Sequence, residues 1–191
     1  MKQNLIEHFR KFIEIDTQDE REILNFFQPK TFAKKKVLTE QSRKCNLHFF
    51  VVKGCLRMFF INDKGVEQTV QFAIENWWIT DYFAFDRQTK TEFTIQAVET
   101  TDILQIDYKN QEKLLNDFPR FERYFRLIYQ RAYSASQLRT KYLYDFSREQ
   151  FYHHFNDNFP EFTKRIPQHI LASYLNMTPE YLSKIKKISR S

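Results

Sequence analysis

The sequence predicts an α+β fold in which an N-terminal β jelly roll is followed by one long helix and a basic, helical C-terminal region. Residues from about 31 to 107 form short apolar or alternating runs separated by turn signals, the pattern of a jelly roll. After Asp107 the apolar residues recur every three or four positions, which is the period of a helix. The chain has only two glycines, so glycine-rich phosphate-binding loops are excluded.

The strand signals differ in kind along the jelly-roll region. VEQTVQFAI alternates, which places Val70 and Phe72 on one face and Thr69 and Gln71 on the other. TEFTIQAV alternates in the same way, whereas LHFFVV and CLRMFFI are almost continuously apolar, as expected for strands in a sandwich core. The two glycines, Gly54 and Gly65, stand at hairpin corners, where a positive φ is often required.

The sequence favours a cytoplasmic protein. The first residues, MKQNLIEHFRKFIEI, have the spacing of a short amphipathic helix and lack the features of a secretory signal. No apolar run is long enough to span a bilayer, so we expect no membrane partner. Cys45 and Cys55 are too few for a disulfide framework. Two interpretations of them remain open: inert thiols, which are favoured, or a redox role.

Positive charge is concentrated towards the C-terminus. The net charge is +6, and residues 138–191 hold nine Lys/Arg against five Asp/Glu, which leaves +4 in that segment. A basic terminal module on a nearly neutral body indicates a polyanionic partner.

A long helix is predicted from the Phe118-Pro119 pair, with proline in the first turn. Its apolar positions follow spacings of four, three, four and three, which is a heptad-like seam. The seam consists of Phe121, Phe125, Ile128, Ala132 and Ala135, widened by Leu127, Leu138 and Tyr142. The helix packs either on its own β domain or against a second copy. We favour a homodimer, because the seam is long and its alanines permit close approach.

The C-terminal segment HILASYLNMTPEYLSKIKK predicts two short helices joined by a tight corner. The first runs from Pro167 to Leu175, Asn176 tolerates the left-handed conformation at the corner, and Thr178 caps a second helix whose first residue is Pro179. The inward-facing residues Ala172, Met177, Leu182 and Ile185 have the spacing of a helix-turn-helix. Upstream, Ser147 and Gln150 match a capping box.

The outer face of the second helix is the predicted DNA-binding surface. Its residues are Thr178, Pro179, Glu180, Tyr181, Ser183, Lys184 and Lys187. Glu180 is expected to accept from a cytosine amino group, and Lys184 to donate to a guanine edge or a phosphate. Lys186, Lys187 and Arg190 are expected to bind phosphates. The alternative is an ordinary helical hairpin with a solvated lysine face. The cap, corner, spaced core and local charge together favour DNA binding.

The order of these parts resembles the Crp/Fnr family of bacterial transcription regulators. VVKGCLRMFFINDKG is similar to the family's paired strands, and RIPQHILASYLNMTPEYLSKIKK to its DNA-binding helices. The resemblance implies two domains: a cyclic-nucleotide-binding-like sensor domain over 1–137, with a dimerisation helix at about 119–137, and a helix-turn-helix domain over 138–191. It also implies a homodimer that reads an inverted repeat in double-stranded DNA near promoters.

The sequence departs from family members that bind cyclic AMP. Thr80-Asp81 stands where the resemblance implies a Gly-Glu pair, and Thr91-Glu92 where it implies Arg-Ser. Loss of the arginine removes charge-assisted bonds to a phosphate, so we expect no tight binding of a cyclic nucleotide. The cysteines of iron–sulfur members are missing too. Only IKKISRS follows Lys184, too short for the family's β-hairpin wing, so the wing is absent or a basic tail replaces it.

Trp77 and Trp78 lie beside this candidate effector pocket, whose residues are Trp77, Trp78, Thr80, Asp81, Thr91 and Glu92. The two tryptophans either fill the mouth of the jelly roll or line an apolar effector site, and the effector is unidentified.

Catalysis is not expected, and neither is a cofactor or a metal. The β region has His48 alone, whereas a metal-dependent jelly-roll enzyme needs several histidines and a carboxylate that converge. The alternative to a DNA-binding regulator is a sensor module that binds an effector or a protein partner without sequence-specific DNA binding.

Overall fold

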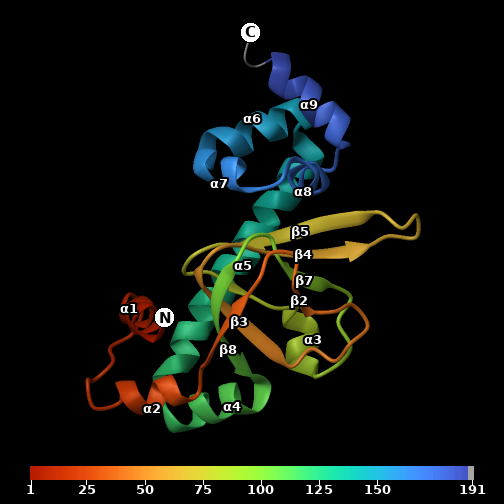
Figure 1. The fold of residues 1–191 in the computed structure, drawn as a ribbon. Helices are drawn as coiled ribbons and strands as arrows, with labels where there is room; N and C mark the ends of the chain where they lie inside the picture. The colour runs from red at the N-terminus through yellow and green to blue at the C-terminus, as the bar shows by residue number, and fades with distance from the viewer. Residues whose placement is uncertain (189–191) are drawn as a thin grey trace. The chain divides into compact units, whose positions relative to one another are not determined.

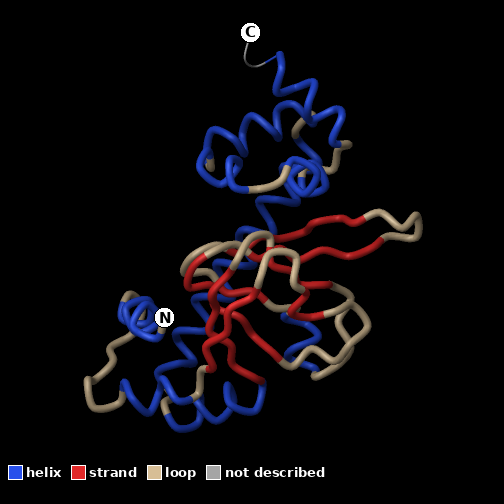
Figure 2. The backbone as a smooth tube through the Cα atoms, viewed as in Figure 1, coloured by secondary structure: helices blue, strands red, loops and turns tan. Residues whose placement is uncertain are grey.

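A computed structural model describes residues 1–188 of the chain (Figures 1 and 2). The chain divides into two compact units. The N-terminal unit comprises Met1–Met58 and Phe72–Arg131, and the C-terminal unit comprises residues 59–71 and everything from Ala132 onward. This division falls between residues 131 and 132 within the long helix and groups the 59–71 hairpin with the C-terminal helices, and the domain boundary at residue 138 stays a prediction.

Two four-stranded sheets form the predicted jelly roll (Figure 2). One has the order β1-β8-β3-β6 and the other β2-β7-β4-β5, and all neighbours except the β4–β5 hairpin are far apart in sequence. The strands are β1 (Gln28–Phe32), β2 (Val37–Thr39), β3 (Leu47–Lys53), β4 (Leu56–Ile61), β5 (Glu67–Ala73), β6 (Trp78–Ile79), β7 (Thr94–Ala97) and β8 (Thr101–Asp107). The pairs β1–β8, β3–β8, β3–β6 and β2–β7 are antiparallel.

Both hairpin glycines have the predicted positive φ, 105° at Gly54 and 73° at Gly65. At Gly54 a side chain is excluded by space as well, because a Cβ would lie 2.6 Å from Oγ1 of Thr101. The β3–β4 turn can therefore pass this close to the start of β8 only with glycine at position 54.

Helices at both ends of the N-terminal unit pack around one aromatic core. They are α1 (Lys2–Arg10), α2 (Glu20–Asn25), α4 (Tyr108–Asp117) and the first half of α5 (Arg120–Asp145), and a short helix, α3 (Tyr82–Arg87), follows β6. Tyr124 of α5 is fully buried at the centre of this core. Its hydroxyl accepts from Trp78 Nε1 at 2.7 Å and lies 2.8 Å from Nδ1 of His8. One phenol thus joins α1, β6 and α5.

The seam residues Phe121, Phe125 and Ile128, expected to face a second copy, are instead buried in the core of their own protomer. Phe9 of α1 stacks edge-on against Phe121 with ring centroids 4.8 Å apart. Periodicity shows that a helix has an apolar face, but the face can be covered by the same chain or another. Of the remaining seam residues, Ala132 is half-buried and Ala135 is exposed.

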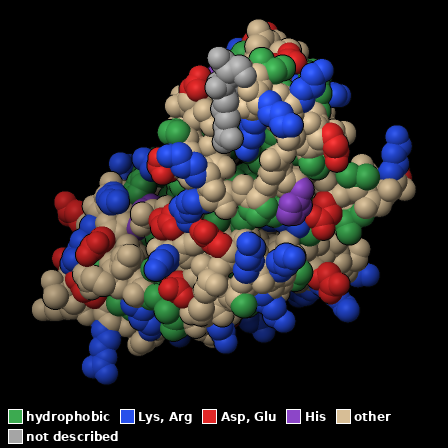
Figure 3. Space-filling view, turned by 45° about the horizontal axis from the view of Figure 1, so that its top comes forward, with side chains coloured by type: hydrophobic (Ala, Val, Ile, Leu, Met, Phe, Trp, Pro, Cys, Tyr) green, Lys and Arg blue, Asp and Glu red, His purple; other side chains and the backbone are tan. Residues whose placement is uncertain are grey.

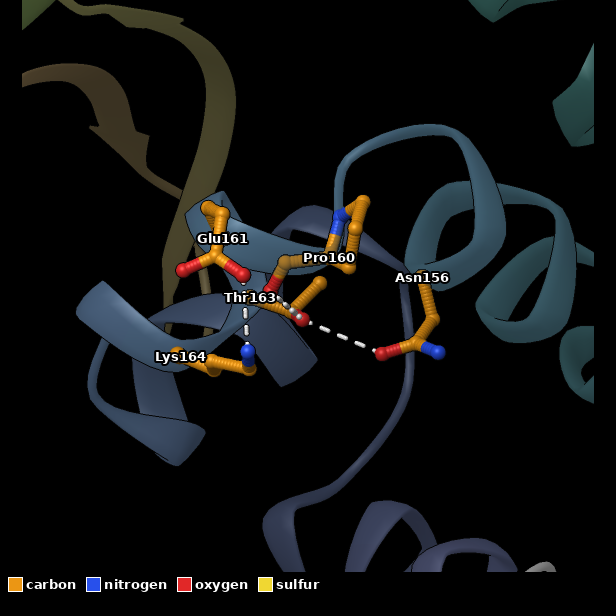
Figure 4. A network of polar contacts seen from close by, with 5 residues as sticks. All are labelled: Asn156, Pro160, Glu161, Thr163 and Lys164. Carbon is orange, nitrogen blue, oxygen red and sulfur yellow. Dashed lines mark hydrogen bonds and ion pairs between the residues drawn. The ribbon is translucent and has the colours of Figure 1, made fainter.

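Four short helices follow α5 in the C-terminal unit: α6 (Arg148–Asn158), α7 (Pro160–Arg165), α8 (Gln168–Tyr174) and α9 (Pro179–Ile188). The predicted capping box is confirmed at the start of α6, where Ser147 and Gln150 exchange both hydrogen bonds. The α6–α7 corner is held by Thr163, whose hydroxyl lies 3.1 Å from Asn156 Oδ1 and 2.9 Å from the Pro160 carbonyl (Figure 4).

Thr69, which the alternation of β5 placed on the polar face, is almost fully buried within the C-terminal unit. Its backbone N–H donates to Ser173 Oγ at 3.0 Å, and Ser173 Oγ lies 2.6 Å from the Thr69 hydroxyl. Arg139 of α5 donates to the carbonyls of Thr69 (3.3 Å) and Tyr174 (3.0 Å). Alternation along one strand cannot reveal a partner a hundred residues away, so this polar cluster was not predicted.

His48 of β3 is, like Tyr124, a fully buried titratable group of the core. The rings of Trp78, Tyr82, Phe85, Phe125 and Tyr129 surround it at centroid distances of 4.5–6.2 Å. Nδ1–H donates to Gln111 Oε1 at 3.1 Å, and Nε2 has no hydrogen-bond partner among the described residues. Burial lowers the pKa of His48 from 6.5 to about 4, so the ring is neutral in the folded protein near neutral pH.

This lowered pKa predicts a loss of stability in mild acid. Below pH 6.5 the unfolded chain takes up a proton at His48 that the folded chain takes up only near pH 4. Above pH 6.5 the shifted pKa of His48 does not change the free energy of unfolding. As the pH drops from 6.5 to about 4, the free energy of unfolding falls by about 3 kcal/mol in total because of this residue. Urea unfolding at about pH 7, 6 and 5 measures the loss. His48→Gln should show a shallower pH dependence, and equal slopes in the two proteins would contradict this assignment.

Candidate nucleic-acid interface and sensor site

The segment 168–188 has the geometry of the predicted helix-turn-helix. Helix α8 ends at Tyr174, Asn176 adopts the left-handed conformation with φ of 55°, and α9 begins at Pro179. The backbone N–H of Met177 donates to the Ala172 carbonyl at 3.0 Å and closes the turn. Asn takes this conformation more readily than other residues with a Cβ, so the corner needs no glycine.

Close packing of α8 on α9 explains the small residue at position 172. Ala172 is fully buried, as are Leu171 and Leu182, and Ile185 is nearly so. A larger side chain at the crossing would push the helices apart and cost about 1–3 kcal/mol through overpacking. Burial of Leu182 and Ile185 fixes the rotation of α9 about its axis and thereby determines which side chains face outward.

The start of α9 is held by two polar contacts. Thr178 is the predicted cap, and its hydroxyl accepts from the Tyr181 backbone N–H at 3.2 Å. Gln168 at the start of α8 donates its side-chain amide to the Pro179 carbonyl at 3.0 Å. These contacts keep the first turn of α9 in a defined position relative to α8.

The structure brings the predicted DNA-binding residues together on one helix and its cap. Thr178, Pro179, Glu180, Lys184 and Lys187 are exposed, and Tyr181 and Ser183 are half-buried. Lys186 lies over the Tyr152 ring at 6.0 Å, so its ammonium group is drawn towards α6. Arg190, expected to bind phosphate, lies outside the described residues.

Glu149 is a member of this surface that sequence reasoning missed. Its Oε1 accepts the hydroxyl hydrogen of Tyr181 at 2.6 Å, and this bond raises the pKa of Tyr181 because it stabilises the neutral phenol. Glu149 precedes Tyr181 by 32 residues. Only the capping box, which fixes where α6 begins, could have signalled that Glu149 lies in a first helical turn.

Basic side chains are not confined to the C-terminal unit. Residues 29–45 contain six Lys/Arg and one Glu, a density that the count over 138–191 overlooked. Lys44 and Lys90 stand directly opposite each other in an isolated antiparallel bridge, an unfavourable pairing of like charges. On the face drawn in Figure 3, Lys and Arg are spread among acidic side chains rather than gathered in one patch. Net charge alone therefore does not locate the interface.

Thr80, Asp81 and Thr91 of the candidate effector pocket meet at the start of α3. Asp81 caps this helix, accepting from the Ala84 N–H at 3.1 Å, and its other oxygen accepts from the Thr91 hydroxyl at 2.8 Å. Thr80 donates to the Leu47 carbonyl at 2.8 Å. The buried carboxylate of Asp81 thus already satisfies the helix start.

The remaining pocket residues are not brought together. Trp78 lies in the core, where it donates to Tyr124, whereas Trp77 is 46% exposed and Glu92 is exposed. Cys45 is buried beside Thr80, and burial raises the pKa of its thiol, which favours the inert, protonated form. Cys55 is buried as well. Among residues 1–188 there is no cluster of His, Cys, Asp or Glu arranged to hold a metal ion.

The comparisons with known proteins agree with this geometry. Residues 29–118 match the family model described as the cyclic nucleotide-binding domain. No curated protein matches the sequence. Within the described part of the chain, no helix has both the length and the apolar character needed to cross a membrane.

Solved structures share the fold over most of the chain. CLP of Xanthomonas campestris, described as a c-di-GMP responsive global regulator, has a TM-score of 0.74 at 12% identity, covering 92% of each chain. A CooA mutant from Carboxydothermus hydrogenoformans has a TM-score of 0.72 at 17% identity, covering 94% of this chain and 86% of that one. A protein from Eubacterium rectale, described as a transcriptional regulator of the Crp/Fnr family, has a TM-score of 0.71 at 15% identity, covering 92% of this chain and 84% of that one.

Residues 29–118 therefore match a cyclic nucleotide-binding domain, and the chain has the fold of Crp/Fnr-type regulators. This confirms the predicted fold class.

Removing the carboxylate of Asp81 tests the account of the α3 start. Asp81→Ala should cost about 2–3 kcal/mol, because α3 loses its cap and Thr91 loses a charged acceptor. Asp81→Asn keeps one acceptor oxygen and should lose about half as much. Urea unfolding measures both. Asp86→Ala, an exposed acid on the same helix, is the control and should change stability by less than about 0.5 kcal/mol. Equal effects at positions 81 and 86 would refute the capping role.

Proposed function

We propose that this protein is a DNA-binding transcription regulator of the Crp/Fnr type, a homodimer that reads an inverted repeat in the cytoplasm. The observation that supports it best is the first turn of α9, capped by Thr178 and rotated by buried Leu182 and Ile185 so that polar and basic groups face outward. A helix presented in this way can enter the major groove with its N-terminal residues against base edges. Two of the structures that share its fold, CLP and the Eubacterium rectale protein, are described as regulators.

The residues of α9 divide by the contacts that they can make. Glu180 at the start of the helix can accept from a cytosine amino group, and Lys184 one turn later can donate to a guanine edge. Ser183 is half-buried beside them and suits a shorter polar contact. Lys187, near the end of the helix, suits a phosphate, which contributes affinity but carries no sequence information.

The second half of α5 is the proposed dimer face. Leu138 is 51% exposed, and Ala135 three residues earlier is exposed as well, on a turn rich in small residues. An exposed leucine beside alanine and serine side chains allows another helix to approach closely. A twofold dimer would then present one α9 helix to each half of an inverted repeat.

We propose that the protein does not respond to cyclic AMP. The start of α3 is occupied by the buried Asp81 carboxylate, which an anionic phosphate would meet with repulsion. Trp78 is held by Tyr124 in the core rather than at a pocket wall. The alternative function is a sensor that binds an effector or protein partner without reading DNA. The basic stretch 29–45 favours an acidic partner in that case.

Selection of bound sequences from a random duplex pool tests the function. We expect enrichment of an inverted repeat whose half-sites lie about one helical turn apart. Affinity for the selected site should fall steeply as salt rises from about 50 to about 200 mM, because phosphate contacts release counterions. Lys184→Ala should cost about 1–3 kcal/mol and relax one position of the half-site. Lys164→Ala, on α7, is the control. Failure to enrich any repeat would favour the partner-binding alternative.

Leu138→Glu tests the dimer face. A charge at this position should weaken the dimer by at least about tenfold in Kd, because an unpaired carboxylate would be buried between two helices. Sedimentation equilibrium measures the change. Thr140→Glu introduces the same charge on the nearly opposite side of α5, since two residues correspond to about 200° of helix. If Leu138→Glu remained as dimeric as Thr140→Glu, the contact would have to lie elsewhere.

A further inference from the structure

The first turns of three helices meet at one place in the C-terminal unit. Gln168 at the start of α8 donates to the Pro179 carbonyl at the start of α9 (3.0 Å). Tyr181 in the first turn of α9 donates to Glu149 in the first turn of α6 (2.6 Å). Helix starts carry partial positive charge, so a carboxylate is stabilised there. Two acids lie in these first turns, Glu149 in α6 and Glu180 in α9, and Glu149 is the one bound by Tyr181.

Helix caps fix the backbone next to both residues of the Tyr181–Glu149 hydrogen bond. Ser147 and Gln150 form the capping box that sets the start of α6, and Thr178 caps α9 through the backbone N–H of Tyr181 itself. The two side chains thus come from positions with little backbone freedom. Glu149 is exposed and Tyr181 is half-buried, so the pair lies at the surface of the unit.

The bond determines what Tyr181 can offer to another molecule. A phenol has one hydrogen to donate and lone pairs to accept with. Because the hydrogen is directed at Glu149, only the lone pairs of the oxygen remain for a partner. Bonding to a carboxylate also raises the pKa of the phenol, so Tyr181 keeps that hydrogen at neutral pH.

Base edges in the major groove differ in what they present. Adenine and cytosine offer an amino group that donates, whereas guanine and thymine offer carbonyl oxygens that accept. A phenol oxygen that acts only as an acceptor can hydrogen-bond to the amino groups of adenine and cytosine, but not to the carbonyl oxygens of guanine and thymine. A tyrosine whose hydroxyl is free can rotate to serve either class.

We propose that Glu149 is a positioning residue that sets base preference: by taking the hydroxyl hydrogen of Tyr181, it makes this tyrosine a hydrogen-bond acceptor and favours adenine or cytosine at the position that Tyr181 meets. The inference rests on the proposed DNA-binding function and deepens it. Glu149 acts through Tyr181, and its carboxylate also discourages non-specific contact with phosphates at the junction.

Selection of bound duplexes with three proteins tests this inference. The wild type should prefer adenine or cytosine over guanine or thymine by about threefold to tenfold at one position of each half-site. Glu149→Ala should lose this preference at that position alone, because the freed hydroxyl can donate as well as accept. Tyr181→Phe should lose it at the same position, because the oxygen is gone.

Two further variants separate the effect of the Glu149 acceptor oxygen from the effect of losing a negative charge. Glu149→Gln keeps an acceptor oxygen for Tyr181 and should retain the preference, while its overall affinity for unrelated duplex rises because a negative charge is removed. Glu161→Ala removes an equal charge from the first turn of α7, where Glu161 pairs with Lys164 at 2.7 Å (Figure 4), and should leave the selected sequence unchanged.

The outcomes distinguish this inference from the function on which it rests. If the wild type enriches no repeat, the proposed function fails. If the wild type enriches a repeat and Glu149→Ala or Tyr181→Phe selects the same bases at every position, the inference is overturned and the function stands. Circular dichroism of each variant checks that it is folded before selection.

Discussion

The buried hydroxyl of Tyr124 is the contact on which the arrangement of the N-terminal unit depends. It binds Trp78 of β6 and His8 of α1 from the first half of α5, so that one residue fixes the long helix against the jelly roll and the N-terminal helix. Burial lowers the pKa of His8 to about 4, which leaves its ring neutral and able to accept from the phenol. The polar atoms of Tyr124, Trp78 and His8 thus satisfy one another, and the first turns of α5 are held in a defined direction. Its remaining turns carry the exposed small residues and Leu138.

A carboxylate of the chain lies at the start of α3 and another at the start of α6, and the two make different contacts. Asp81 is buried, and its two oxygens accept from the α3 backbone and from Thr91. Glu149 is exposed and bound by Tyr181, so it modifies a surface that remains open to a partner. The first arrangement caps a helix inside the sensor domain, and the second directs the hydroxyl hydrogen of a tyrosine on α9. Both follow from the preference of a helix N-terminus for negative charge.

Much of the fold could be predicted because its signals are local. The caps at Ser147 and Thr178, the corner at Asn176 and the glycine turns each depend on residues close in sequence, and all are confirmed. The contacts that were missed join distant segments. Periodicity identified Phe121, Phe125 and Ile128 as one apolar face but could not tell that α1 and the jelly roll cover it. Alternation made Thr69 a surface residue, whereas Ser173 and Arg139 bury it. Adjacent Trp77 and Trp78 look alike in sequence, yet Trp78 in β6 is buried in the core, whereas Trp77, just before the strand, is 46% exposed.

The central claim is that α9 enters the major groove of DNA as one of a symmetric pair, and methylation interference on a selected binding site tests it most directly. Methyl groups at guanine N7 block the major groove, and those at adenine N3 block the minor groove. The account predicts that N7 methylation prevents binding in two patches about one helical turn apart, related by the twofold axis of the repeat, and that N3 methylation within these patches has little effect. A single patch, or interference confined to adenine N3, would contradict it.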